Sequence, residues 1–343
     1  MRVNVAFFAR LLLLGFILPI IMSAVVYQGF SSNYTVRLFS EQGFRWQYET
    51  GVYKYRVLGR FLLIGTYRCI QHHDLPTIAP LALRVLDRRG DPQFYSAYFY
   101  LNTIFLCLTC LALFFALGGH RAGADFLSAD LPVLFLMSLM TLSQYVVVPY
   151  DMLSYFFLAV AAWLIVRGIR EWWEILASGT MVVLGTLTRE TTALILAFHL
   201  ACNYRAILTI PAGMRLNRAQ RTLVWLAACF VATYLGLRMT FGYERPVFET
   251  MIFPTGYDVS TQIGILAFVG IAFLAGIVLL LFSSRPNVTG MWVFLLASLP
   301  YVGAVPFIAD TWEIRLWVPV ILLLTIIKVN ASRLEGGPES AAA

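Results

Sequence analysis

Long, uninterrupted runs of apolar residues alternate with short polar stretches along the chain. Continuous runs are typical of membrane-spanning helices, whereas a transmembrane β-barrel shows strict alternation of apolar and polar positions. The pattern therefore predicts an all-α, polytopic helical membrane protein with about ten transmembrane segments. The predicted segments cover residues 11–26, 95–117, 131–148, 152–166, 172–188, 191–204, 223–241, 262–283, 290–307 and 315–329.

The longest polar region, residues 28–94, follows the first predicted span and forms the predicted first outer loop. Within it, the run 61–70 is amphipathic, too short to span a membrane and charged at its ends, which favours a helix lying in the membrane interface. The chain otherwise forms one predicted transmembrane domain over residues 1–333. The polar, small-residue tail 334–343 is predicted to be disordered.

The stretch 172–204 can be read as one long helix or as two short spans that meet at residues 188–191. A single crossing would place Arg205, Arg215, Arg218 and Arg221 outside, against the positive-inside rule. Two short spans are therefore predicted, with Arg189 at the outer face. Both termini are then cytoplasmic, and the expected location is the bacterial inner (plasma) membrane.

The composition agrees with this class, because 60% of the residues are hydrophobic and 13% are charged, with a mean hydropathy of +0.77. Soluble domains have about 45–50% apolar and about 25% charged residues. Ordinary soluble, disordered and disulfide-stapled secreted proteins are thereby excluded. The net charge of +7 is expected from basic cytoplasmic loops, so no nucleic-acid partner is predicted.

The cysteines and histidines do not form a recognisable metal motif. Cys107 and Cys110 have the CxxC spacing but lie inside a predicted span without a second pair, so they are predicted to be core residues. His72 and His73 are adjacent, and no acid stands at ligand spacing from them. No metal site is predicted, and metal dependence is left open.

Most of the 18 acidic residues fall on the predicted outer side. Ionisable groups at membrane depth are costly and usually functional, which suggests an outward-facing polar site. The alternative is that the outer loops merely need charged residues to be solvated.

The first of four polar clusters spans residues 47–60 in the first outer loop and contains Glu49, Tyr53, Arg56 and Arg60. A carboxylate beside tyrosines and arginines suits the binding of a sugar and a phosphate, because rings pack on sugar faces and arginine chelates phosphate oxygens. An interfacial aromatic belt with snorkelling arginines explains the same cluster equally well.

The other three clusters lie at predicted outer helix ends. Asp151 joins two spans almost without a loop, and capping of the following helix is an alternative role for it. Arg189 and Glu190 lie at the junction 188–191, where an ion pair with a helix cap is the alternative. Residues 310–315, with Glu313 and Arg315, begin the last span and could be a cap with an anchoring tryptophan.

The order of these motifs resembles the GT-C superfamily of integral-membrane glycosyltransferases. The resemblance covers most of the chain in architecture but only about twenty residues in motif. It implies a lipid-phosphate-linked sugar donor, used at the outer or lumenal face, and a catalytic Asp or Glu in the first outer loop. This chain departs from the common pattern, because it has neither an Asp near the end of the first span nor an Asp-Asp pair. Glu49 and Glu41 are the candidates for the base.

Transfer from a lipid phosphate by single inverting displacement needs a general base for the acceptor and cations for the leaving phosphate. The predicted catalytic residues are Glu49, with Glu41 in reserve. The predicted substrate-binding residues are Arg56, Arg189 and Arg315 on the phosphate, Glu190 and Glu313 orienting them, Asp151 on a sugar hydroxyl or shaping the site, and Tyr53 and Arg60. The predicted partners are the lipid-linked donor and membrane lipids. A secondary transporter and a non-catalytic membrane scaffold are the alternatives.

Overall fold

The computed structural model describes residues 5–29, 39–49, 52–78, 90–119, 126–209, 216–242, 288–308 and 314–330, and these residues are almost entirely helical. No strand occurs among them, which confirms the all-α class. The bundle consists of a continuous first helix (α1 Val5–Leu12, η1 Leu13–Ile17, α2 Leu18–Gly29), α6 (Pro92–Ala116), α7 (Leu131–Leu142), α8 (Asp151–Arg167), α9 (Trp172–Thr186), α10 (Leu194–Leu208), α11 (Arg218–Phe241), α13 (Val288–Ala297), α14 (Leu299–Ile308) and α15 (Ile314–Val329).

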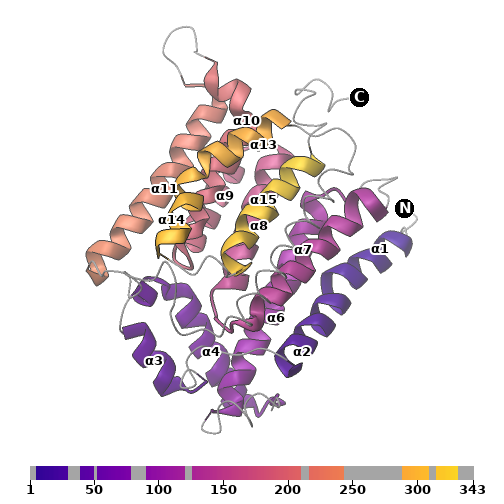
Figure 1. The fold of residues 1–343 in the computed structure, drawn as a ribbon, viewed down its shortest axis with the longest axis vertical. Helices are drawn as coiled ribbons and strands as arrows, with labels where there is room; N and C mark the ends of the chain where they lie inside the picture. Colours follow the sequence, from indigo (N-terminus) through magenta and orange to yellow (C-terminus); the bar gives the residue numbers. More distant parts are fainter. Residues whose placement is uncertain are drawn as a thin grey trace.

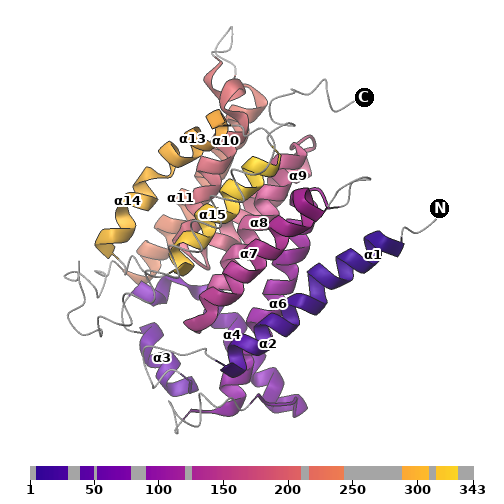
Figure 2. The same ribbon diagram turned by 45° about the vertical axis from the view of Figure 1, so that its right-hand side comes forward.

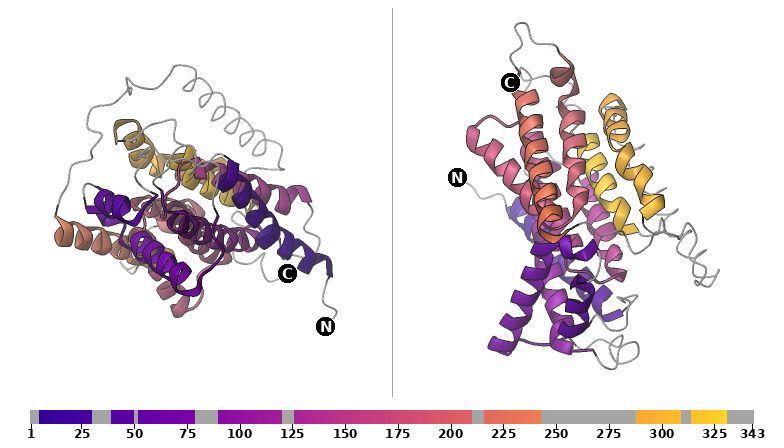
Figure 3. Two further views of the ribbon diagram at one scale, coloured as in Figure 1. Left: turned by 90° about the horizontal axis from the view of Figure 1, so that it is seen from below. Right: turned by 90° about the vertical axis from the view of Figure 1, so that its left-hand side faces the viewer.

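The bundle has two distinct ends (Figure 1). At the end called here the terminal end, Arg10 of α1 pairs with Asp130 before α7, and the Asn330 amide donates to the Ala116 carbonyl over 2.9 Å. The opposite end, called the loop end, carries α3 (Glu41–Glu49), η2 (Val52–Tyr55) and α4 (Val57–His73). Figure 3 shows this α3–α4 segment extending beyond the bundle.

Four described helical stretches are long and apolar enough to cross a membrane: Val5–Gly29, Pro92–Ala116, Glu190–Leu208 and Arg218–Phe241. They make the chain compatible with a membrane protein. Helices α7, α8, α9 and α15, which correspond to further predicted spans, have 12 to 17 residues and belong to the same bundle. The predicted span 262–283 and the tail 334–343 lie outside the described residues, and the total of ten spans stays a prediction.

The predicted break between residues 188 and 191 is confirmed. Helix α9 ends at Thr186, Arg189 is extended with φ −165° and ψ 140°, and the short helix η5 (Glu190–Ala193) leads into α10. The Trp225 indole donates to the Ile175 carbonyl, so the first half of α11 lies beside the start of α9. Nε2 of His199 lies within hydrogen-bonding distance of the Ala219 carbonyl oxygen, so α11 begins beside α10 as well. Helices α9 and α10 are therefore antiparallel; Figure 2 shows where both lie in the bundle.

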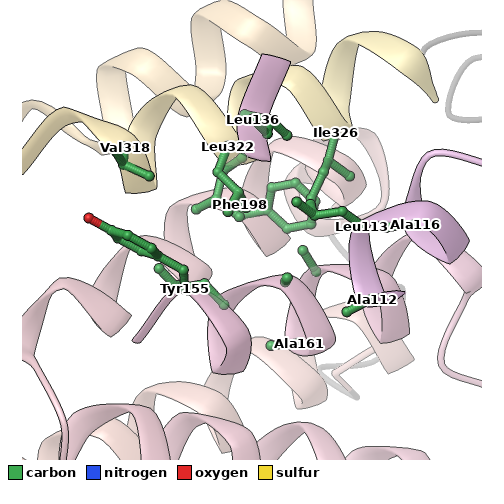
Figure 4. Close-up of a cluster of buried hydrophobic side chains, with 14 of the residues drawn as sticks. Ala112, Leu113, Ala116, Leu136, Tyr155, Ala161, Phe198, Val318, Leu322 and Ile326 are labelled. Atoms are coloured by element: carbon green, nitrogen blue, oxygen red, sulfur yellow. The ribbon is translucent and has the colours of Figure 1, made fainter. Parts of the chain in front are cut away.

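Two groups of buried apolar side chains hold the helices together. In the larger group, Phe198 of α10 packs among Leu113 of α6, Leu136 of α7 and Leu322 of α15 (Figure 4). Cys107 and Cys110 are free, and both are buried, as predicted.

The smaller group lies at the loop end and is mainly aromatic. Helix α4 contributes Leu63, Tyr67 and Ile70 to it, whereas Phe61 on the opposite face is 72% exposed. The predicted helix at 61–70 is thus confirmed as part of a longer one, and its place in a membrane interface stays a prediction. Asp91 anchors α4 to the bundle, because it caps α6 through the Gln93 N–H and accepts the Tyr67 hydroxyl over 2.6 Å.

Candidate functional site

Asp151 is the first residue of α8 and is completely buried. Its Oδ1 accepts a hydrogen bond from Nη1 of Arg189, and its Oδ2 lies 3.9 Å from Nη1 of Arg315. The cap position of α8 is held by Tyr150, and no side-chain capping bond forms there. Ion pairing therefore accounts for the buried carboxylate better than capping does. We call Asp151, Arg189 and Arg315 the charged junction.

The gap between α9 and η5 positions Arg189. Its N–H donates to the Gly185 carbonyl over 2.7 Å, and its own carbonyl accepts the Thr192 hydroxyl over 3.0 Å. A Cβ added at Gly185 would lie 2.7 Å from Thr192 Oγ1, so glycine permits this close turn. The prediction that Arg189 lies near an acid is confirmed, with Asp151 as the partner.

Arg315 lies in the first turn of α15 and is 8% exposed. Two phenols fix the backbone at this point. The Tyr155 hydroxyl of α8 donates to the Arg315 carbonyl over 3.0 Å, and the Tyr301 hydroxyl of α14 donates to the Leu316 carbonyl over 2.7 Å. The start of α15 is thus tied to two other helices beside Asp151.

Arg56, between η2 and α4, is held over two aromatic rings. Its guanidinium carbon lies 4.0 Å from the centroid of Tyr150 and 5.0 Å from that of Tyr53, and these two rings are stacked at 6.2 Å. Such cation–π contacts favour a guanidinium that has lost part of its water. We call Tyr53, Arg56 and Tyr150 the aromatic clamp. Because Tyr150 precedes Asp151, the clamp adjoins the charged junction.

The clamp leaves hydrogen-bonding atoms without partners. Arg56 forms no ion pair with the described residues, and its buried Nε has no hydrogen-bond partner. The neighbouring Tyr48, whose ring lies 6.5 Å from that of Tyr53, has a buried hydroxyl that also lacks a partner. Burial raises the pKa of Tyr48 well above its ordinary value, so its phenol stays protonated and can donate. Burial likewise raises the pKa of Tyr150 to about 12, although the Arg56 charge opposes that rise.

Backbone contacts hold the clamp against the bundle. The Leu58 N–H donates to the Leu187 carbonyl over 3.1 Å, which joins the start of α4 to the end of α9. A Cβ added at Gly59 would lie 3.1 Å from Cβ of Tyr150, so the two backbones approach closely. The first loop and the junction therefore form one assembly.

Glu190 has an ion-pair partner that the sequence analysis did not select. Its Oε1 lies 3.4 Å from Nη2 of Arg238, near the end of α11. The Arg238 guanidinium also covers the Tyr55 ring at 3.6 Å, and the Tyr55 hydroxyl donates to the Gly242 carbonyl over 2.5 Å. Arg238 thereby links η2, η5 and α11.

The remaining predicted residues have different surroundings. Glu41 pairs with Arg45 over 2.6 Å on its own helix, and both side chains are partly exposed. Arg60 lies one turn after Arg56 on α4, and its N–H donates to the Arg56 carbonyl. Glu49 ends α3, but its side chain lies outside the described part, as does all of Glu313.

The structure thus brings together Tyr53, Arg56, Asp151, Arg189 and Arg315 from four separate places in the chain. The predicted polar clusters contain Tyr48 and Tyr150, but neither was selected as a site residue, and Arg238 was missed. The position of Tyr150 beside Asp151 was a usable signal, whereas nothing local to Arg238 reveals its partner. Within the described ranges, no three His, Cys, Asp or Glu side chains gather in a way that could hold a metal ion. The chain matches no model of a protein family, no curated protein and no solved structure.

Proposed function

We propose that this chain is an integral-membrane glycosyltransferase of the GT-C type, which moves a sugar from a polyprenyl-phosphate donor to an acceptor at the outer face. The observation that carries the proposal is Arg56. This guanidinium forms no ion pair with the described residues, since Glu190 acts on it only at longer range, and it keeps an unpartnered buried Nε beside the charged junction. A partly buried cation with unused donors favours an anionic ligand, and guanidinium groups bind phosphate through two parallel hydrogen bonds.

The arrangement provides for both parts of the donor. Arg56 and the Tyr48 hydroxyl offer hydrogen-bond donors to the phosphate oxygens, and the half-buried Tyr53 ring offers apolar surface to a sugar ring. The Tyr150 ring is buried and covered by Arg56, so its part is to hold that guanidinium in place. Asp151 holds Arg189 in place, so its positive charge is preorganised for the negative charge that develops on the leaving phosphate. Arg315 adds a second guanidinium at the same carboxylate.

In the proposed reaction, Glu49 takes the proton from the acceptor hydroxyl, with Glu41 as the reserve base. The acceptor oxygen forms a bond to the anomeric carbon as the bond from that carbon to the phosphate oxygen breaks, with inversion. The lipid phosphate leaves as an anion and needs no proton from the enzyme. Glu49 ends α3 directly before η2, which places its backbone beside the segment that carries Tyr53.

The proposed topology puts the loop end outside and both termini in the cytoplasm of a bacterial inner membrane, with about ten spans. It is supported by the arginines that the terminal end carries at the ends of its helices, among them Arg10, Arg167, Arg205 and Arg218. Arginine in short loops favours the cytoplasmic side.

The test is incubation of the purified protein in nanodiscs with a panel of radiolabelled polyprenyl-phosphate sugars. Transfer or release of sugar from one donor is expected. Arg56→Gln should weaken donor binding and turnover together, because a phosphate contact exists in both the ground state and the transition state. Arg68→Gln is the matched control, since Arg68 is exposed on the same helix. Equal loss in both variants, or no reaction with any donor, would speak against the proposal.

A secondary transporter is the second candidate, favoured by the two helix interruptions at residues 146–150 and 187–189. Transporters commonly bind substrate where spans are broken, and here the interruptions bring Asp151 and Arg189 together. Proteoliposomes distinguish the two functions. A transporter moves an intact labelled solute across the bilayer, whereas a glycosyltransferase breaks the bond between sugar and lipid phosphate.

A further inference from the structure

A cavity of about 510 Å³ opens at the terminal end, between the end of α8, the second half of α10 and the start of α11. Its apolar wall includes Ile165 and Ile169, and its polar lining includes His199, Asn203, Arg218 and Thr222. Ligand pockets commonly have volumes of about 300–1,000 Å³ with an apolar wall and few polar groups. Asp151 begins α8 and this cavity lies at its other end, about 25 Å away for a helix of 17 residues. The cavity is therefore separate from the charged junction.

Two polar groups of the lining make no hydrogen bond or ion pair with the residues that the structure describes. Thr222 is 2% exposed, and its hydroxyl makes no hydrogen bond with the described residues. Most helical threonines that are buried here bond to the carbonyl four residues earlier, as Thr109 and Thr186 do. The guanidinium of Arg218, in the first turn of α11, forms neither an ion pair nor a hydrogen bond with the described residues, and its charge acts on the Glu174 carboxylate only at longer range. Both groups are available to a ligand in the cavity.

The cavity wall is already fixed by hydrogen bonds. Asn217 caps α11 by accepting the Gln220 N–H over 2.9 Å, and its amide donates to the Ala206 carbonyl over 2.6 Å. Nε2 of His199 lies 3.0 Å from the Ala219 carbonyl, so the proton of the neutral ring is on Nε2. Asn203 has non-helical angles, φ −122° and ψ 19°, which bend α10 at the cavity. A ligand therefore meets a preorganised site.

The charges around the opening favour an anion. Arg167, Arg170, Arg205 and Arg221 are exposed on the same helix ends. The nearby carboxylate of Glu174 is used internally, since it accepts the N–H groups of Arg170 and Glu171 in the capping box of α9. Positive charge thus exceeds negative charge at the described surface around the cavity.

We propose that this cavity binds the phosphate headgroup of an anionic membrane phospholipid. Arg218 and the Thr222 hydroxyl contact the phosphate oxygens, and the wall formed by Ile165 and Ile169 contacts the glycerol and the first methylenes of an acyl chain. The combination of an apolar wall with a single cationic group fits an amphipathic anion better than it fits a free inorganic ion. This site does not depend on the proposed glycosyl transfer.

The test measures binding to the full-length protein in detergent by native mass spectrometry and by thermal shift. The probes are phosphatidylglycerol, phosphatidylcholine and inorganic phosphate. Phosphatidylglycerol should bind and raise the unfolding temperature, and the other two probes should not. Arg218→Gln and Thr222→Val should each weaken its binding about tenfold, as expected for loss of a hydrogen bond to a charged group. Thr222→Val should leave the unfolding temperature without lipid unchanged, because no internal hydrogen bond is lost.

Arg221→Gln is the matched control, because it removes the same charge from the same end of α11 but does not line the cavity. It should leave phosphatidylglycerol binding within about twofold of the unmodified protein. Equal weakening by Arg221→Gln would show a diffuse surface effect and overturn the site. If phosphatidylcholine binds as tightly as phosphatidylglycerol, the headgroup charge plays no role and the proposal fails. If inorganic phosphate raises the unfolding temperature as much as phosphatidylglycerol does, the lipid assignment is overturned.

Discussion

Replacing Asp151 by Asn tests the charged junction directly. Asn keeps the volume of Asp and one carbonyl oxygen, so the variant removes the negative charge with little change in packing. Arg189, with 5% of its side chain exposed, and Arg315, with 10%, would then lose the counter-charge they share. We expect a large loss of stability for this reason.

The magnitude follows from burial and distance. Two unit charges 3.9 Å apart, the separation of Oδ2 and Arg315 Nη1, attract by ~4 kcal/mol at an effective dielectric constant of about 20. Breaking a buried ion pair by removing one partner typically costs about 3–5 kcal/mol, because the remaining charge stays buried and uncompensated. Asp151→Asn should therefore lower the free energy of unfolding by about 4 kcal/mol.

The assay is denaturation in mixed detergent micelles, followed by circular dichroism. Glu41→Gln is the matched control, because it makes the same chemical change at the partly exposed pair with Arg45. Such a pair contributes about 0.3–0.5 kcal/mol to the free energy of unfolding. If Asp151→Asn fails to fold, the double variant Asp151→Asn with Arg189→Gln provides the comparison, since it removes the buried charge together with its partner.

Two results would refute the reasoning. One is a loss below about 1 kcal/mol for Asp151→Asn, or a loss equal to that of the Glu41 control. The other is strict additivity of Asp151→Asn and Arg189→Gln, because residues that share a buried ion pair couple by about 0.5–3 kcal/mol.

Three further predictions concern the catalytic base, the tyrosine beside the aromatic clamp and the turn that positions Arg189. Glu49→Gln should lower the rate of sugar transfer about 10²–10⁴-fold while donor binding is kept. If Glu41→Gln abolishes transfer instead, the base is Glu41, and if neither variant lowers the rate of transfer, the glycosyltransferase proposal fails. Tyr48→Phe should leave the free energy of unfolding within about 0.5 kcal/mol of that of the unmodified protein, since no hydrogen-bond partner is lost, but it should raise the donor Kd several-fold. A donor titration that gives an unchanged Kd would remove Tyr48 from the site. Gly185→Ala should lower the free energy of unfolding by about 1–3 kcal/mol in the same micelle denaturation assay, because the added methyl group would collide with the Thr192 side chain beside Arg189. A free energy of unfolding equal to that of the unmodified protein would show that the turn relaxes to make room for the methyl group.

The helical class and the interruption at residues 188–191 could be predicted because both depend on local sequence. Apolar runs mark the helices, and an Arg-Glu pair between two apolar runs is costly inside a helix that crosses lipid. The bounds of α4 were harder to predict. Hydropathy ends the run near residue 70, but the helix continues to His73, until Asp74 adopts φ 48° and ψ 44°. Backbone geometry at Asp74 ends this helix.

The partners within the site could not be predicted, because the chain brings together residues that are far apart in sequence. Asp151 was predicted to be a site residue because it is a polar residue at an outer helix end. Its partners Arg189 and Arg315, however, come from two other helix ends. Charge type alone does not decide whether Glu190 faces Arg56, Arg189 or Arg238. The burial of Tyr48 depends on how α3 packs on the bundle, and that packing cannot be inferred from the sequence of α3 alone.

The attachment of the α3–α4 segment has a consequence for how the chain is made. Leu58 is held by the Leu187 carbonyl and Tyr55 by the Gly242 carbonyl, so this early segment is anchored by residues synthesised much later. At ribosomal rates of about 5–20 residues per second, roughly 10–40 s separate the emergence of the segment from that of its last anchor. During that interval Tyr67 can already contact Asp91 and Phe94 of α6, but Tyr55 lacks its native partners on α11, Arg238 and Gly242. Biogenesis of this protein therefore includes a waiting period, in which the segment is open to insertion factors and proteases at the membrane.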